Sequence, residues 1–359
     1  MAARTRFLVS ALALWIGISA CGGHGSPNQP TQDAPTIACP VAPDPVVSVD
    51  GSAQVVSFGA PTVTAGQPPL TTSCIPVSGA AFTVGTTTVT CTTSDAKART
   101  ASCTFNVVVQ PPPKLSVTSF LAFGDSITEG EDGQNTAALA NPHIFVQLPF
   151  AERYPSVLLA ELQARYQLQT PNVVNDGYTG ESLSGGLSSS CDGGPLEQSG
   201  AFMRYARDVS ANQSTGLLLM EGSNDVDDAY NCDGGLNDSC LVPKAVAVLR
   251  RIIDDAKSHG IRVVLATIPP MIPPGANCRA KGSSGVPGFN DLVRSLAASE
   301  NVPLADVYQA FGSDASTLIG FDGLHPNPDG YKRIADTFFG AIKSSLETSN
   351  STSRTRRVR

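Results

Sequence analysis

The stretch Ser119-Phe120-Leu121-Ala122-Phe123-Gly124-Asp125-Ser126-Ile127-Thr128 decides the fold of most of this chain. It begins with a short apolar run, which is typical of a strand buried on both faces of a parallel sheet. Gly124 permits a sharp turn directly after this strand. Ser126 follows where the chain turns toward a helix or loop, so its hydroxyl lies at the sheet edge and its own N–H points to the same place. We therefore expect a parallel sheet with Ser126 at the carboxyl end of one strand.

Segments typical of strands and of helices alternate along the rest of the chain. The strands are expected over Ser119–Phe123, Asn172–Asn175, Gly216–Met220, Ile261–Ile268 and Val302–Asp306. Helical spacing of apolar residues is found over Tyr154–Gln167, Leu196–Ala211, Lys244–His259 and Pro287–Glu300, and a closing helix is expected over roughly Asp329 to Leu346. This alternation builds a parallel sheet with helices on both faces, and such sheets bind ligands at the carboxyl ends of their strands.

Three further blocks complete a pattern that begins with Gly124-Asp125-Ser126-Ile127-Thr128. They are Asn175-Asp176-Gly177-Tyr178-Thr179-Gly180, Gly222-Ser223-Asn224-Asp225 and Asp322-Gly323-Leu324-His325-Pro326. Each block alone is ordinary turn chemistry. In this order they supply a hydroxyl, two hydrogen-bond donors and an Asp-His pair three residues apart, which are the parts that acyl transfer needs.

His325 is the histidine that suits this chemistry. The others are His24 in a spacer, His143 in an irregular insertion without a nearby acid, and His259 at a helix end, where a cation suits the dipole. Only His325 has an acid, Asp322, three residues upstream. On a tight turn Asp322 fixes the tautomer of the ring and leaves the other nitrogen to accept the proton of Ser126.

The four blocks resemble the SGNH (GDSL) esterase superfamily, and the resemblance covers roughly Leu115 to Leu346. It implies a three-layer α/β/α, flavodoxin-like fold over residues 116–347 and hydrolysis of carboxylic esters through an acyl-enzyme on Ser126, with Asp322 and His325. It also implies an oxyanion hole made of the Ser126 N–H, the Gly180 N–H and the Asn224 amide. The sequence alone leaves Gly177 open as the rival of Gly180. This chemistry requires no cofactor and no metal.

Two other functions stay open, and the motifs also leave thioesters or lysophospholipids open as substrates. The same site suits a carbohydrate esterase that removes acetyl groups from polysaccharide, so the substrate is a small ester or an acylated polysaccharide or lipid. Alternatively, the chain is a surface adhesion or binding protein with a vestigial hydrolase fold. The insertion over residues 131–148 is expected to be a lid or a wall of the pocket.

A separate all-β region is expected over residues 36–110. Thr and Val dominate it and turn residues punctuate it, which favours an immunoglobulin-like sandwich of about seven strands. The segments Phe82–Cys91 and Cys103–Val107 resemble a HYR (hyalin repeat) module. The resemblance implies an extracellular spacer or adhesion domain, with cell-surface or glycan contact as a possible role. A Pro-rich linker over 111–115 separates this region from the next domain.

The N-terminal residues 1–20 have the composition of a signal peptide, with Arg4, Arg6 and an apolar run. Ile18-Ser19-Ala20-Cys21 also resembles a bacterial lipobox, which implies a lipid on Cys21 and anchoring in the cell envelope, at the outer membrane or cell surface. The alternative is an ordinary signal peptide and a secreted protein. Residues 21–35 are then a flexible spacer, and 348–359 a disordered basic tail.

The cysteines agree with export. Setting Cys21 aside leaves eight of the nine, an even number that favours disulfides. In the β region we predict the pairs Cys39–Cys103 and Cys74–Cys91. The pairing of the other four stays open: Cys191, Cys232, Cys240 and Cys278.

Two other classes of site are disfavoured. No Cys-x-x-Cys pair exists for zinc. The acids Asp225, Asp227, Asp228 and Asp233 lack an EF-hand pattern, so a solvated loop is favoured over a calcium site. A net charge of −7 argues against a nucleic-acid partner, because no basic face is available to neutralise phosphates.

Overall fold

The computed structural model describes residues 33–134, 146–191, 194–273 and 278–348. The predicted signal segment, Cys21, His24, His143 with the middle of the 131–148 insertion, and residues 349–359 lie outside the described residues. The chain divides into two compact units. Among the described residues, one unit comprises 33–43 with Val56–Ala80 and Thr88–Val107, and the other comprises Asp44–Val55, Ala81–Thr87 and the described residues from Val108 onward.

The larger unit is built on a five-stranded parallel sheet with the order β11-β10-β12-β13-β14. The strands are β10 (Ser119–Gly124), β11 (Asn172–Gly177), β12 (Gly216–Met220), β13 (Arg262–Ala266) and β14 (Leu304–Ala305). This is the flavodoxin-like order, so the prediction of the fold is confirmed. The order reverses beside β10, and sheets of this kind bind ligands at the carboxyl ends of the strands where that happens.

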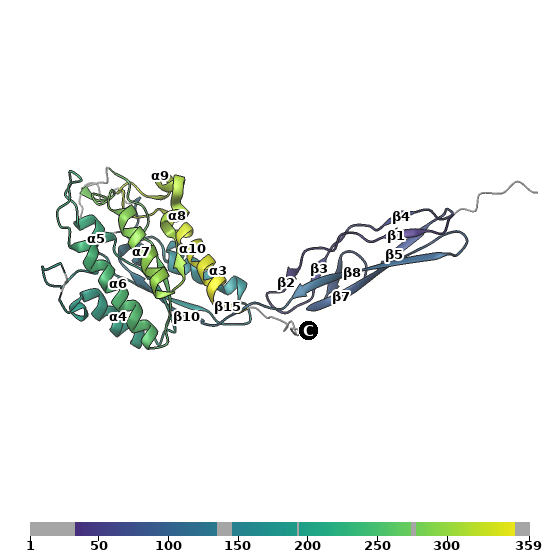
Figure 1. Ribbon diagram of the computed structural model, residues 1–359, viewed down its shortest axis with the longest axis horizontal. Helices are drawn as coiled ribbons and strands as arrows, with labels where there is room; N and C mark the ends of the chain where they lie inside the picture. The colour runs from purple at the N-terminus through teal and green to yellow at the C-terminus, as the bar shows by residue number, and fades with distance from the viewer. Residues whose placement is uncertain (1–32, 135–145, 192–193, 274–277, 349–359) are drawn as a thin grey trace, which may run out of the picture. The chain divides into compact units, whose positions relative to one another are not determined.

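The apolar run of β10 explains why both faces of the sheet are covered. Phe120 and Ala122 pack into one core, and Leu121 and Phe123 pack into the other, because successive side chains of a strand point to opposite faces. Helices α3 (Tyr154–Arg165) and α10 (Pro328–Leu346) cover the first face. The second face is covered by three helices, α4 (Gly200–Ala211), α6 (Leu241–Ser258) and α7 (Val286–Glu300) (Figure 1).

Shorter elements complete this unit. They are α1 (Ser126–Glu129), η1 (Phe150–Glu152), η2 (Leu196–Gln198), α5 (Ser223–Asp228), α8 (Val307–Phe311), η4 (Gly312–Asp314), α9 (Ala315–Leu318), and the antiparallel pair β9 (Lys114–Leu115) and β15 (Glu347–Thr348).

Two predicted helix boundaries differ from the structure for local reasons. The helix expected over Leu196–Ala211 is divided into η2 and α4, because the Ser199 side chain accepts the Phe202 N–H and starts a new helix there. Helix α6 begins at Leu241 rather than Lys244, since a proline is tolerated in the first turn. Strand β13 ends at Ala266, two residues before the predicted end.

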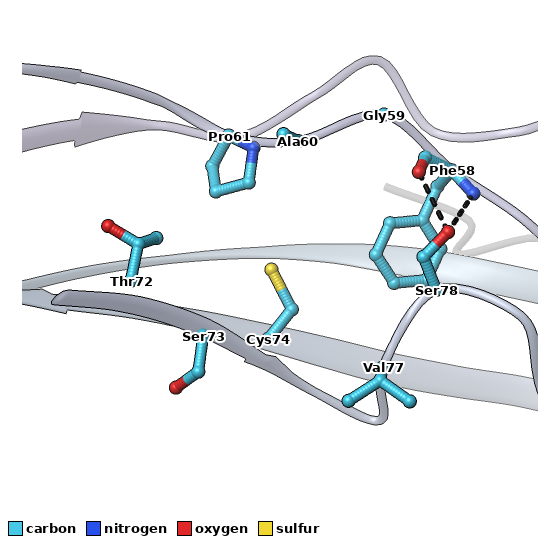
Figure 2. A pocket seen from close by; sticks show the side chains of 9 residues that line it. All are labelled: Phe58, Gly59, Ala60, Pro61, Thr72, Ser73, Cys74, Val77 and Ser78. Atoms are coloured by element: carbon cyan, nitrogen blue, oxygen red, sulfur yellow. Dashed lines mark hydrogen bonds between the residues drawn. The ribbon is translucent and has the colours of Figure 1, made fainter.

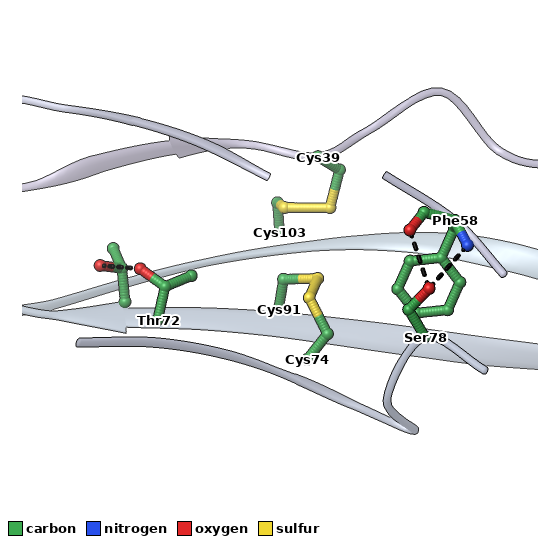
Figure 3. Close-up of a disulfide and its surroundings, with 8 residues drawn as sticks. Cys39, Phe58, Thr72, Cys74, Ser78, Cys91 and Cys103 are labelled. Carbon is green, nitrogen blue, oxygen red and sulfur yellow. Dashed lines mark hydrogen bonds between the residues drawn. A yellow bond between two sulfur atoms is a disulfide. The ribbon is translucent and has the colours of Figure 1, made fainter. Parts of the chain in front are cut away.

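The β-rich region contains eight strands rather than about seven. They are β1 (Thr36–Ala38), β2 (Val46–Val47), β3 (Gln54–Val56), β4 (Thr62–Thr64), β5 (Thr71–Ile75), β6 (Ala80–Phe82), β7 (Gly85–Ser94) and β8 (Thr100–Gln110). A four-stranded sheet has the order β2-β8-β7-β5, and β1-β4 and β3-β6 form two-stranded pairs. Two disulfides, Cys39–Cys103 and Cys74–Cys91, have the pairing expected from the sequence (Figure 3).

A hollow of about 360 Å³ lies beside these disulfides. Figure 2 shows Phe58, Pro61 and Val77 along it, with Ser78 turned toward the Phe58 backbone. The Ser78 hydroxyl donates to the Phe58 carbonyl and accepts its N–H, both at 2.8 Å. The Thr72 hydroxyl bonds Thr93 at 3.0 Å. These two polar side chains of the hollow are therefore already paired within the protein.

The pairing that the sequence left open is Cys191–Cys240 and Cys232–Cys278. Both bonds join loops at the periphery of the α/β unit. Four disulfides in one chain indicate a protein of an oxidising, extracytoplasmic compartment. Within the described ranges, no helix is both long and apolar enough to cross a membrane.

We expect Gly124→Ala to lower the free energy of unfolding by about 1–3 kcal/mol. A Cβ at this position would overlap the Thr128 side chain and the Met220 carbonyl, which belong to two different elements. Urea denaturation measures the change. Gly340→Ala on α10 is the control: open space surrounds its Cβ, so stability should hold or rise slightly. A Gly124→Ala variant as stable as wild type would contradict the close packing at the end of β10.

Candidate active site

Ser126 stands at the first position of α1, directly after β10. The Asp125 carboxylate accepts the Ile127 N–H at 2.9 Å and so caps this short helix. The first N–H groups of a helix have no partner within it, so the Ser126 N–H is directed outward at the carboxyl end of the sheet. The side chain is buried, with 4% of its surface exposed. Local sequence thus places a hydroxyl and an N–H at one point.

The structure brings Ser126, His325 and Asp322 into one hydrogen-bonded line. The Ser126 Oγ lies 2.8 Å from His325 Nε2, and His325 Nδ1 lies 2.5 Å from Asp322 Oδ2. The other Asp322 oxygen accepts the N–H groups of Leu324 and His325, both at 2.9 Å, so the turn itself holds the carboxylate. An ionised Asp322 accepts a hydrogen bond from Nδ1–H, which leaves the Nε2 lone pair to accept the hydroxyl proton of Ser126.

Burial and charge compete in setting the protonation of this line. Burial lowers the pKa of His325, but the hydrogen bond and charge of Asp322, helped by Glu131, outweigh it, and the net direction is upward. Burial raises the pKa of Asp322, but its bonds to His325 and to two backbone N–H groups bring it below its usual value. The carboxylate therefore stays ionised, and the imidazole is more basic than a free one.

The two glycines that the sequence left open have different environments. The Gly177 N–H donates to Asn175 Oδ1 at 3.0 Å, and a Cβ on Gly177 would overlap the backbone of Glu129. Gly180 adopts a left-handed conformation with φ of 76°, and a Cβ there would meet nothing within 4 Å. Its N–H has no acceptor among the residues that the structure describes. Of the two, only Gly180 keeps an N–H available to a ligand.

Asn224, in the first turn of α5, lies next to the same loop. Its Nδ2 donates one hydrogen bond to the Glu181 carbonyl at 2.7 Å. This bond fixes the orientation of the amide, and the second hydrogen on that nitrogen stays available. The third block is therefore anchored directly to the loop that carries Gly180.

Two charged residues that sequence analysis missed hold the Gly180 loop. The Glu129 carboxylate accepts both the N–H and the hydroxyl of Thr179, at 2.7 and 2.6 Å. Arg204, from α4, pairs with Glu181 and donates to the Asp176 and Gly124 carbonyls at 2.8 and 3.1 Å. Arg204 thereby joins the ends of β10 and β11 to the loop. No local pattern indicated this, since Arg204 comes from a helix on the covering layer.

The acids considered for calcium are bonded within the protein. Asp225 accepts the N–H groups of Leu183 and Ser184, both at 2.8 Å, and burial raises its pKa to about 6. Asp227 accepts the Gly282 N–H at 3.0 Å, and Asp228 pairs with Lys281. These carboxylates hold turns and loops.

A second carboxylate and an arginine also reach His325. Glu131 Oε2 lies 3.2 Å from His325 Nε2, and Arg279 Nη1 lies 3.0 Å from Asp322 Oδ2. The sequence indicated Glu131 only as the first residue of the insertion over residues 131–148, and no sequence pattern pointed to Arg279. Glu131 follows Ser126 by only five residues, and this short separation in the sequence was a signal that it lies near the serine. Arg279 follows Cys278 in a loop and carried none.

The models of two known families match parts of the chain. The model of the GDSL-like lipase/acylhydrolase family matches residues 122–333, and the model of the HYR domain matches residues 31–109. A multidomain esterase of Ruminococcus flavefaciens is 30% identical over 185 residues, which are 50% of this chain and 21% of that protein. The chain thus matches about a fifth of the length of this curated relative.

Solved structures with likeness to the chain include two hydrolases. An acetylxylan esterase from Geobacillus stearothermophilus is 23% identical with a TM-score of 0.46, over 64% of this chain and 96% of the other. An alpha/beta hydrolase enzyme from the metagenome of Lake Arreo is 23% identical with a TM-score of 0.44, over 63% and 95%.

Glu221 gives a pH test of the buried acids around the site. It is fully buried, and one carboxyl oxygen has no hydrogen-bond partner within the described part of the chain. Burial, and then the charges of Asp125, Glu181 and Asp225, raise its pKa well above the usual value. A group whose pKa is raised on folding loses its stabilising effect as pH rises through the folded pKa.

We therefore expect Glu221→Gln to melt at a higher temperature than wild type by a margin that grows as pH rises from about 5 to about 8. Thermal melts followed by circular dichroism measure this margin. Glu152→Gln, the same change on an exposed residue, should show a constant offset. A margin for Glu221→Gln that stays flat or shrinks with pH would refute the assignment of a buried, protonated Glu221.

Proposed function

Because the chain belongs to the GDSL-like lipase/acylhydrolase family, we propose that it is an exported serine esterase that hydrolyses carboxylic esters through an acyl-enzyme intermediate. The observation that carries this proposal is the unbroken line from Ser126 through His325 to Asp322. Its distances match those needed for a hydroxyl activated by a neighbouring base.

In the first half of the reaction, Ser126 Oγ attacks the ester carbonyl carbon and its proton moves to His325 Nε2. Charge develops on the carbonyl oxygen, which accepts hydrogen bonds from the N–H groups of Ser126 and Gly180 and from the Asn224 amide. The carbon–oxygen bond to the alcohol then breaks, and the imidazolium returns its proton to the departing oxygen. Asp322 stabilises the imidazolium throughout.

In the second half, water replaces the alcohol. His325 takes a proton from the water as its oxygen attacks the acyl carbon, and the same three donors stabilise the second oxyanion. The bond to Ser126 Oγ breaks, the serine recovers its proton, and the acid leaves. These protein groups and one water supply the nucleophiles, proton transfers and hydrogen-bond donors of both steps. The proposed reaction therefore requires no metal or organic cofactor.

The proposed place of action is the outside of a bacterial cell. A lipid on Cys21, which lies outside the described residues, would tether the mature protein to the envelope. The HYR region then serves as a spacer that holds the esterase away from the membrane. The paired Thr72 and Ser78 hydroxyls of the hollow beside its disulfides favour this passive role over a polar ligand there.

Exposed aromatic rings beside the catalytic blocks favour an acetylated polysaccharide as the substrate. Tyr178, two residues before Gly180, is 60% exposed, and Phe321, next to Asp322, is 62% exposed. Large apolar side chains left in solvent around a site are typical of a binding surface, and flat aromatic faces stack well on sugar rings. The second candidate function is therefore deacetylation of a glycan by the same three residues.

We expect Ser126→Ala to lower kcat/KM on p-nitrophenyl acetate by about 10³-fold or more, because it removes the nucleophile. It should also abolish labelling by a fluorophosphonate probe. Ser344→Ala, at an exposed position on α10, is the control and should retain both. Wild-type protein that neither turns over an ester panel nor reacts with the probe would favour the adhesion alternative.

The aromatic rings give a test of substrate class. Tyr178→Ala and Phe321→Ala should each lower kcat/KM on acetylated xylan several-fold while p-nitrophenyl acetate hydrolysis is largely retained, because the small ester does not reach these rings. Leu168→Ala is the control, since Leu168 is also exposed but lies before β11, at the opposite edge of the sheet. Equal losses on both substrates would argue against a glycan surface.

A further inference from the structure

Glu131 is a second carboxylate at the catalytic imidazole. Its Oε2 lies 3.2 Å from His325 Nε2, the nitrogen that also faces Ser126 Oγ. The residue is almost fully buried, with 2% of its surface exposed. Its backbone is fixed as well: its N–H donates to the Ser126 carbonyl at 3.0 Å, and its carbonyl accepts the Tyr331 hydroxyl at 2.7 Å. A buried carboxylate held on both sides of its backbone is a built feature of the site.

This carboxylate distinguishes between the two protonation states of His325. When Nδ1 donates to Asp322, neutral His325 presents a lone pair at Nε2, and the Glu131 oxygen opposite it gains no bond. After the imidazole takes the Ser126 proton, Nε2 carries a hydrogen and a share of positive charge. Glu131 then attracts it at close range in a site of low dielectric. Glu131 therefore favours the state that forms during catalysis.

The same negative charge also acts on His325 in the resting protein. Three carboxylates surround His325: Asp322 on its own turn, Glu131 after α1, and the buried Asp125 that caps α1. Negative charges this close raise the pKa of an imidazole. Without an opposing cation, they would raise the pKa of His325 further and favour the protonated imidazole, which cannot accept the proton of Ser126.

Arg279 supplies the opposing charge. Its Nη1 donates to Glu131 Oε1 at 2.9 Å and to Asp322 Oδ2 at 3.0 Å, so one nitrogen bridges both carboxylates. The same nitrogen lies 3.5 Å from His325 Nδ1. The loop that carries it is anchored by the Cys232–Cys278 disulfide next to it and by the bond from Gly282 N–H to Asp227. A fixed cation here lowers the proton affinity of the imidazole and compensates both acids.

We propose that Glu131 and Arg279 are an opposed pair of positioning residues that set the proton affinity of His325. Glu131 stabilises the imidazolium that forms when Ser126 gives up its proton. Arg279 keeps the resting imidazole neutral and able to receive that proton. The proton moves only from Ser126 Oγ to His325 Nε2, so no further reactant is involved. The proposal rests on the esterase function proposed above.

The first experiment is the pH profile of kcat/KM on p-nitrophenyl acetate. Arg279→Ala should move the acidic limb to higher pH by about 1 unit or more, because the imidazole must lose its proton to act as a base. Glu131→Gln should move the limb the other way. Arg279→Lys should restore most of the wild-type profile. Lys281→Ala, a charge removed from the same loop but facing Asp228, is the control and should leave the limb in place.

The second experiment needs no turnover. In a Ser126→Ala background, nitrogen-15 NMR follows the titration of the His325 ring, with the other histidines as internal references. Arg279→Ala should raise and Glu131→Gln should lower its midpoint. If wild-type protein shows no esterase activity but the His325 midpoints shift as expected, the result supports the pair and overturns only the proposed function. If wild type is active but the acidic limb and the His325 midpoint stay in place in both variants, the proposed pair is overturned. The same holds if both variants shift them in the same direction.

Discussion

Backbone segments approach one another closely at the carboxyl end of β10, and glycines make this approach possible. A side chain on Gly124 would overlap the Met220 carbonyl of β12, and one on Gly177 would overlap the backbone that follows Ser126. A side chain on Gly133 would overlap the carbonyl of His325 itself. Because these three positions are glycines, segments some two hundred positions apart in the sequence can meet at one edge of the sheet. The approach of Ser126 to His325 is a consequence of that packing.

Several acidic side chains are buried near this edge of the sheet. Asp125, Asp225, Glu131, Glu221 and Asp322 are all buried around one serine. Burying a charge is costly unless it is paired or neutralised. Three features offset this cost: backbone N–H groups bond Asp225 and Asp322, two arginines pair with Glu131, Asp322 and Glu181, and the raised pKa of Glu221 favours its neutral form. The charge balance of the site therefore depends on helices and loops far from the serine in sequence.

The sequence predicts features that depend on neighbours along the chain. The apolar run before Gly124, the Asp-His pair three residues apart and the glycines of the second block are local patterns. Strand–helix alternation predicts a parallel sheet covered on both faces, and the family resemblance implies its flavodoxin-like order. Arg204 and Arg279 were missed because their partners lie on other elements, and an arginine in a helix or loop has no distinctive context. For the same reason the loop disulfides stayed open, whereas Cys74 and Cys91 face each other on paired strands.

The bond between Cys232 and Cys278 carries an implication about timing. The sulfur bridge lies one residue from the guanidinium that moderates the imidazole, yet it forms only where thiols are oxidised. A newly synthesised chain, still in the reducing interior of the cell, lacks this clamp on its arginine. In the proposed exported esterase, Arg279 would therefore be held in place only after the chain reaches an oxidising compartment.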